Sequence, residues 1–154
     1  MLIALLAALV ALGAAACGGG GGVGSTQGAA ARDRSPEAVI RAWVDTLRRG
    51  DVKGAAEYFA LPSIVENGTP PLELRTRSDA RAFNSALPCG AVLLRTSSSG
   101  RFTTAVFRLT ERPGRGSCGS GVGERARTTF VIRDGKIREW RRVADQPQSS
   151  GPLV

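Results

Sequence analysis

The amino-acid sequence predicts an α+β domain in which helices come first and an antiparallel sheet follows. Two observations lead to this class. Apolar residues recur at helical spacing up to about residue 88, and they alternate with a period of two from residue 91 to residue 143. Helices followed by a run of strands is an order typical of α+β proteins. We therefore expect one folded domain over residues 35–143.

The first helix has clear start and stop signals. Ser35 is a capping hydroxyl, Pro36 suits the first helical position, and Glu37 places an acid in the first turn. Gly50 follows two arginines and is expected to end the helix. Apolar residues lie at helical spacing between these signals, at Val39, Ile40, Trp43, Val44 and Leu47.

Two shorter helices are expected next. Asp51 can cap one that Pro62 would end, and Ser78 can cap another that Pro88 would stop. Their predicted buried positions are Ala55, Tyr58 and Phe59 in the first of these, and Ala80, Phe83 and Leu87 in the second.

Four strands are expected after these helices, at residues 91–96, 102–111, 124–133 and 136–143. Asp134-Gly135 is a favourable hairpin turn between the last two strands. The glycine-rich segment 113–123 is expected to be a long hairpin loop. It contains no G-x-G-x-x-G that follows a strand and opens a helix, so we do not expect phosphate binding there.

The N-terminal residues indicate export. Residues 1–16 contain an apolar run too short to span a bilayer, followed by small residues and Cys17. This pattern resembles the lipobox of bacterial lipoproteins, which implies a diacylated Cys17 and anchoring to the outer face of the cell membrane. An ordinary secretory signal cut near Ala16 is the alternative. Residues 17–34 would then be a flexible glycine-rich tether, and residues 144–154 a disordered tail.

The cysteine count fits this location. If Cys17 carries lipid, Cys89 and Cys118 remain as a pair that an oxidising compartment would join. Closing a loop of this length stabilises a domain by about 3–4 kcal/mol. The sequence contains no histidine and no C-x-x-C, so neither a metal site, a cofactor nor a redox pair is expected.

Two segments resemble a known family. The opening SPEAVIRAWVDTLRRGDVKGAAEYF and the closing TTFVIRDGKIREWRRV are similar to those of nuclear transport factor 2-like and SnoaL-like domains. The resemblance covers roughly residues 35–143. It implies a cone with an open mouth, made by a curved sheet wrapped around the long first helix. Relatives of this fold include isomerases, dehydratases and epoxide hydrolases.

The charge of +8 is concentrated in the predicted sheet, because residues 91–143 contain twelve basic and four acidic groups. Strand alternation would place Thr103, Phe107 and Phe130 inward and leave a basic outer face. That face could be merely solvated, could contact an anionic surface, or could form a homodimer through Trp140. Export and the few aromatic residues disfavour nucleic acid. The face would comprise Arg108, Arg112, Arg125, Arg127, Arg133, Lys136, Arg138 and Arg142, with Trp140 among them.

The same alternation would point Glu139 and Arg141 into the cone, where charged groups must pair or line a wet cavity. A register slip of one residue would instead put Trp140 inside and both charges outside. The predicted pocket combines these two charges with aromatic side chains of the helices: Trp43, Tyr58, Phe59 and Phe83.

These features favour a non-catalytic domain that binds a small apolar ligand or a cell-envelope partner. The absence of histidine removes the commonest general base near neutral pH. An enzyme of the ketosteroid-isomerase or dehydratase type is the second hypothesis, and an accessory scaffold for cell-wall proteins is the third. Acid–base chemistry would rest on one of four carboxylates: Asp45, Glu57, Glu66 or Glu139.

Overall fold

The computed structural model describes residues 34–144. The predicted signal segment, Cys17 and almost all of the predicted tether and tail lie outside these residues. No helix within the described part of the chain is long and apolar enough to cross a membrane.

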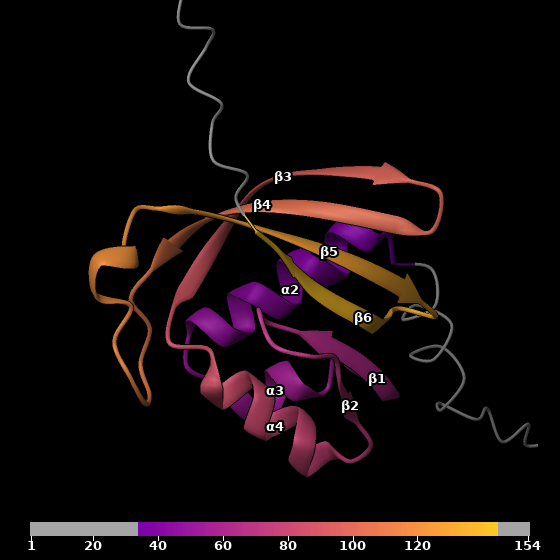
Figure 1. Ribbon diagram of the computed structural model, residues 1–154, viewed down its shortest axis with the longest axis horizontal. Helices are drawn as coiled ribbons and strands as arrows, with labels where there is room; N and C mark the ends of the chain where they lie inside the picture. The colour runs from indigo at the N-terminus through magenta and orange to yellow at the C-terminus, as the bar shows by residue number, and fades with distance from the viewer. Residues whose placement is uncertain (1–33, 145–154) are drawn as a thin grey trace, which may run out of the picture.

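The domain is α+β, as predicted: helices fill the concave side of one curved, six-stranded sheet that does not close (Figure 1). The strand order is β2-β1-β6-β5-β4-β3, and every neighbouring pair is antiparallel except β1 and β6. The helices are α2 (Pro36–Arg48), α3 (Val52–Ala56) and α4 (Arg77–Ala86). The strands are β1 (Phe59–Glu66), β2 (Leu72–Leu74), β3 (Gly90–Ser99), β4 (Phe102–Thr110), β5 (Arg125–Arg133) and β6 (Lys136–Val143).

The predicted first helix is confirmed as α2. The Ser35 hydroxyl accepts a hydrogen bond from the backbone N–H of Ala38 at 3.3 Å, and Pro36 occupies the first turn. Gly50 follows the helix with a φ of +85°, and a Cβ there would lie 3.0 Å from Pro113 Cβ. The glycine is therefore needed both for the backbone conformation and for the close approach of the loop after β4.

The second helix is shorter than predicted, and a strand replaces its second half. The helix α3 ends at Ala56, and Phe59 begins β1, which pairs with both β2 and β6. Pro62 misled the sequence analysis because proline is rare inside a strand. It lies between the two paired stretches of β1 and β6, where the register shifts and a missing N–H is tolerated.

The third helix begins two residues earlier than predicted. Thr76, not Ser78, is its N-cap: the Thr76 hydroxyl accepts from the backbone N–H of Asp79, and the Asp79 carboxylate accepts from the N–H of Thr76. This reciprocal pair is a capping box. The backbone N–H of Thr76 lowers the pKa of Asp79, because it stabilises the ionised carboxylate.

The four predicted strands are confirmed, as is the turn at Asp134-Gly135, where both residues have positive φ. The predicted disulfide is also present: Cys89 is joined to Cys118. It ties the loop between β4 and β5 to the connection between α4 and β3. Within that loop the Glu111 carboxylate accepts hydrogen bonds from the hydroxyl of Ser117 and from two backbone N–H groups.

The face predicted for the middle of β6 is wrong, because the strand contains a bulge. Ile137 pairs with Ile132 and Glu139 pairs with Val131, which leaves Arg138 as an extra residue. The extra residue reverses the alternation, so Ile137 and Trp140 both lie in the core. Glu139 and Arg141 therefore lie on the outer face, the alternative arrangement considered from the sequence.

An aromatic cluster fills the middle of the cone. Trp43 on α2 packs edge-to-face against the rings of Phe59, Phe130 and Trp140, with centroids 5.8–6.5 Å apart. Phe83 on α4 packs against Phe59 and Trp140. Edge-to-face aromatic pairs add about 0.5–1.5 kcal/mol each to the burial of their surface. The cluster thus joins both longer helices to three strands.

Arg112 was assigned to the outer basic face, but it is buried, with 7% of its surface exposed. Its guanidinium donates to the backbone carbonyls of Asn84, Ser85 and Leu87, at the C-terminal end of α4. These carbonyls carry the negative end of the helix dipole, which compensates the buried charge. Burial lowers the pKa of Arg112 because the charged form loses hydration.

We expect Arg112→Met to lower the free energy of unfolding by about 2–3 kcal/mol, because the carbonyls at the end of α4 lose a charged donor. The measurement is urea denaturation of the oxidised protein. Arg115→Met is the matched control, since Arg115 is exposed in the same loop and its loss should change little. A change below about 0.5 kcal/mol for Arg112→Met, typical of an ordinary surface substitution, would show that Arg112 does not hold α4 to the loop.

Candidate functional site

A cavity of about 140 Å³ opens at the mouth of the cone. Its walls come from α2, from the connection between α4 and β3, and from the concave faces of β3 to β6. The lining is mainly apolar and aromatic, which is typical of sites for small molecules. The residues that line it are Trp43, Val44, Leu47, Asn67, Leu87, Pro88, Cys89, Ala91, Phe107, Leu109, Ala126, Thr128, Trp140 and Arg142.

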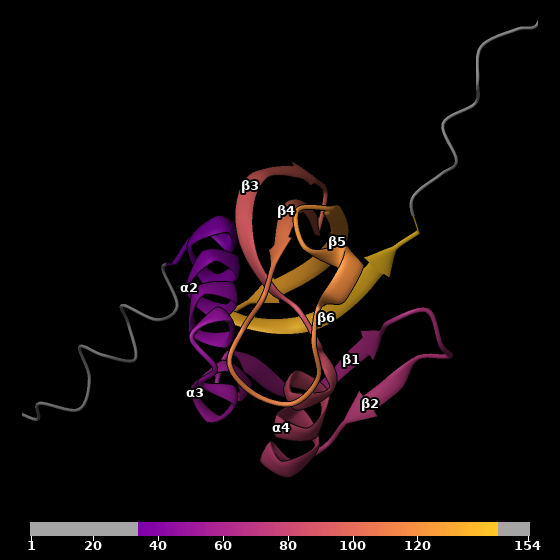
Figure 2. The ribbon, with the colours of Figure 1, turned by 90° about the vertical axis from the view of Figure 1, so that its left-hand side faces the viewer.

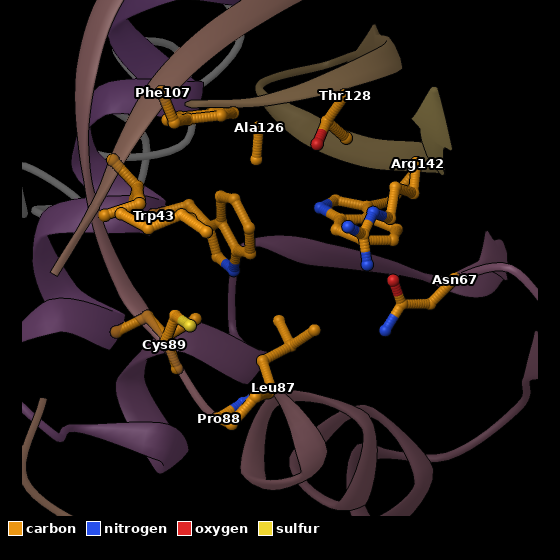
Figure 3. A pocket seen from close by; sticks show the side chains of 14 residues that line it. Trp43, Asn67, Leu87, Pro88, Cys89, Phe107, Ala126, Thr128 and Arg142 are labelled. Atoms are coloured by element: carbon orange, nitrogen blue, oxygen red, sulfur yellow. The ribbon is translucent and has the colours of Figure 1, made fainter. Parts of the chain in front are cut away.

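The polar groups of the cavity gather at one side. Figure 3 shows Asn67 and Arg142 pointing toward one another, with Thr128 nearby, while Trp43, Pro88 and Cys89 lie across the cavity from them. Arg142 is exposed, and it makes no ion pair with the rest of the described chain. The cavity therefore has an apolar side and a side with hydrogen-bond donors.

Trp43 is fixed in place by a buried hydrogen bond. Its indole N–H donates to the side-chain oxygen of Asn84 at 2.9 Å, and the Asn84 amide donates to the carbonyl of Ala80 at 2.8 Å. Asn84 is completely buried on α4. This pair gives the apolar wall a set orientation, because Trp43 is held from two helices at once.

Trp140, the other indole of the cavity wall, differs from Trp43. Its N–H is buried and has no hydrogen-bond partner within residues 34–144. A buried donor without an acceptor costs about 1–3 kcal/mol. Trp140 pairs with Phe130 across the strands, and its neighbour on the same face, Arg142, pairs with Thr128. Trp140 thus lies on the same side of the cavity as Arg142 and Thr128.

Within the described part of the chain, no carboxylate lines the cavity. The four candidate acid–base residues are all ion-paired with arginines elsewhere. Asp45 lies 3.4 Å from Arg48 and Glu57 lies 3.2 Å from Arg77. Glu66 and Glu139 both bind Arg141 on the outer side of the sheet. The arrangement therefore offers hydrogen-bond donors to a ligand and places no carboxylate as a general base within the cavity.

Of the predicted pocket residues, only Trp43 lines the cavity. Phe59 is completely buried in the core, and half-buried Phe83 packs against it. Tyr58 lies at another surface hollow beside Lys136. Glu139 and Arg141 lie outside the cone because of the bulge in β6, and their mutual ion pair measures 3.1 Å.

Because of the same bulge, the residues of the predicted basic face do not all lie on one face of the sheet. Arg108 and Arg127 are exposed on the outer face, and exposed Arg133 is at the hairpin turn. Arg138 lies in the bulge, 3.8 Å from Asp134. Trp140 and Arg142 belong to the concave face, so Trp140 is not available for the dimer contact considered from the sequence.

Several cavity residues were not found from the sequence. Asn67 lies in a turn after β1, a strand that was not predicted. Thr128 lies two residues before Phe130, on the face predicted to point inward, but nothing in the sequence marked it as part of a site. Arg142 would have been found if the bulge had been recognised, since it lies two residues after Trp140 on the same face. Within the described residues, no three acidic or cysteine side chains gather where they could hold a metal ion.

Comparison with known proteins shows likeness in fold. No family model matches the chain, and no curated protein matches it. Among solved structures, a nuclear transport factor 2-like protein of unknown function from Cytophaga hutchinsonii superimposes with a TM-score of 0.56 at 9% identity, covering 72% of this chain and 90% of its own.

Two further structures are similar. A candidate polyketide cyclase from Sinorhizobium meliloti has a TM-score of 0.53 at 18% identity and covers 71% of this chain and 95% of its own. A candidate ketosteroid isomerase from Kribbella flavida has a TM-score of 0.52 at 20% identity and covers 76% of this chain and 87% of its own. At these identities the likeness shows architecture alone. The chain thus has the nuclear transport factor 2-like fold, a helix-filled cone made by one curved sheet.

Proposed function

We propose that the chain is an exported, lipid-anchored binding protein whose cone holds a small apolar ligand with an oxygen-bearing end. One observation carries this proposal: the described residues make the cavity apolar on one side, and on the other they offer hydrogen-bond donors and groups that both donate and accept, with no carboxylate among them. The anchor at Cys17 follows from the sequence pattern, and the cavity supports the binding role.

The size of the cavity limits the ligand. At about 140 Å³ it is smaller than the sites of drug-sized molecules, and a space of this order holds one six-membered ring. The ring would contact Trp43 and Leu87. A carboxylate or carbonyl oxygen would lie beside Arg142 and Asn67.

An isomerase or dehydratase of the kind found in this fold is less well supported. Such chemistry needs an acid–base group against the ligand. The glutamates and aspartates considered for that role are ion-paired with arginines outside the cavity. Binding without turnover therefore agrees better with the groups that face the cavity.

A matched set of one-ring probes tests the ligand class. We expect benzoate to bind more tightly than toluene, and benzylamine to bind most weakly, because the described residues that line the cavity include a guanidinium and no acid. Both tryptophans of the sequence line the cavity, so binding should change the intrinsic fluorescence. Probe at ten times its Kd should add about 1.4 kcal/mol of stability, a rise in Tm of several degrees.

Arg142→Gln is the discriminating variant in that experiment. It should remove the preference for benzoate over toluene and leave toluene binding unchanged, because the apolar wall is intact. Equal binding of benzoate and benzylamine by the unchanged protein would contradict the ligand class. Absence of binding by all three probes would contradict the cavity as a site for one-ring ligands.

Filling the cavity tests whether it is the binding site. Ala126 lies on β5 and its side chain faces the cavity (Figure 3). We expect Ala126→Phe to abolish the fluorescence response to benzoate and to keep the unfolding free energy within about 1.5 kcal/mol, since the ring occupies open space. Thr129→Phe, on the outer face of the same strand, is the control. Unchanged benzoate binding by Ala126→Phe would place the ligand elsewhere.

The anchor is tested separately with the full chain expressed in a bacterium fed an alkyne-tagged fatty acid. We expect the tag to label the protein through Cys17, so that Cys17→Ser abolishes labelling while Cys89→Ser retains it. The measurement is in-gel fluorescence after coupling of a dye. Labelling that survives Cys17→Ser, or is absent from the unchanged chain, would contradict the lipid anchor.

A further inference from the structure

The two ends of the outer sheet face differ in how their charges are compensated. At the end near the turn between β3 and β4, Arg101 lies 3.3 Å from Glu139, and Arg141 lies 3.1 Å from the same carboxylate. Arg141 also binds Glu66, and Arg101 stacks on the ring of Phe102. These acids raise the pKa of Arg141 and neutralise this end of the face.

The opposite end carries four exposed arginines without acidic partners, here called the arginine cluster. They come from three adjacent strands, β3, β4 and β5, which lie side by side in the sheet and form its upper part in Figure 1. No ion pair within residues 34–144 involves any of them. The members of the arginine cluster are Arg95, Arg108, Arg125 and Arg127.

The strand register brings these side chains together. Arg108 pairs directly with Arg125, while Arg95 and Arg127 flank Val106 from its two sides. Val106 is only 6% exposed although it is not part of the core cluster, which agrees with cover by the hydrocarbon stems of its arginine neighbours. The result is a broad guanidinium surface over a small apolar base.

This arrangement opposes folding rather than favouring it. Like charges placed directly opposite on neighbouring strands destabilise a sheet, and neither Arg108 nor Arg125 forms an ion pair with a described residue. An external anion would relieve the repulsion. Guanidinium groups bind phosphate oxygens in pairs of parallel hydrogen bonds, so phosphate is a better match than a lone carboxylate.

We propose that the arginine cluster is a contact surface for the phosphate headgroups of an anionic membrane. This role goes beyond ligand binding in the cone, and it uses the membrane location proposed above. Cys17 precedes Arg34, the first described residue, by 17 positions. A glycine-rich linker of that length spans roughly 23 Å. The domain would therefore lie within about its own diameter of the lipid surface, where each arginine adds to attraction for the headgroups.

Vesicle binding by residues 32–154 tests this surface without the lipid anchor. This segment contains every described helix and strand, the core cluster and the disulfide. We expect it to sediment with vesicles that contain phosphatidylglycerol and to remain free of pure phosphatidylcholine. High salt should release it, because the attraction is electrostatic.

The location of the surface is tested by two variants of equal charge. Arg125→Gln/Arg127→Gln removes half of the arginine cluster and should weaken vesicle binding by about 25-fold, at roughly fivefold for each arginine. Arg81→Gln/Arg133→Gln removes the same charge from α4 and from the other end of the sheet, and should weaken it by less than about fivefold. Thermal unfolding of each variant checks that the fold is kept.

Equal losses in the two double variants would overturn the proposal, because binding would then depend on net charge alone. Binding to a soluble anionic polysaccharide without binding to vesicles would also overturn it, in favour of a polymer. Benzoate binding in the cone should be unchanged in Arg125→Gln/Arg127→Gln. Vesicle binding tests the membrane surface and benzoate binding tests the cavity, so either proposal can be contradicted without the other.

Discussion

The structure depends on the packing of one side chain, Trp43. Its ring contacts aromatic rings from β1, β5 and β6, and its N–H is bound by Asn84 on α4. Figure 2 shows α2 along one side of the curved sheet and α4 below the sheet in that view. Because Trp43 joins all of these elements, the curvature of the sheet and the position of α4 are set together. Trp43 and Trp140 belong both to this packing and to the wall of the cavity, so the cavity adjoins the aromatic cluster.

Charged groups are sorted by the same architecture. Acids and arginines neutralise one another on the outer face around Arg141, and the end of α4 compensates the buried Arg112 through backbone carbonyls. Among the cations that have no ion pair within residues 34–144, two groups bear on the proposals: Arg142 beside the cavity and the arginine cluster on the convex surface. Both places present donors that form no ion pair with the described residues, which is why both are proposed to meet anionic partners, although of very different size.

Prediction from the sequence succeeded where the signal is local. The caps of α2, the turn at Asp134-Gly135 and the pairing of Cys89 with Cys118 each depend on a few neighbouring residues or on a simple count. It failed for β1, because Pro62 argues against a strand and only the pairing with β2 and β6 makes one. It also failed for the candidate site: among the predicted pocket residues only Trp43 lines the cavity.

By itself the sequence determined the α+β class, the inward faces of β4 and β5 and the disulfide. The hydrophobic period, the capping residues and the number of cysteines can be read directly from the sequence, without knowledge of tertiary contacts. Only the tertiary structure decided which side chains face the cavity. One extra residue in β6, Arg138, reverses the alternation and moves Trp140 and Arg142 inside. Such a bulge has no sequence signature of its own, since it results from how β6 fits against β5 and the helices it covers.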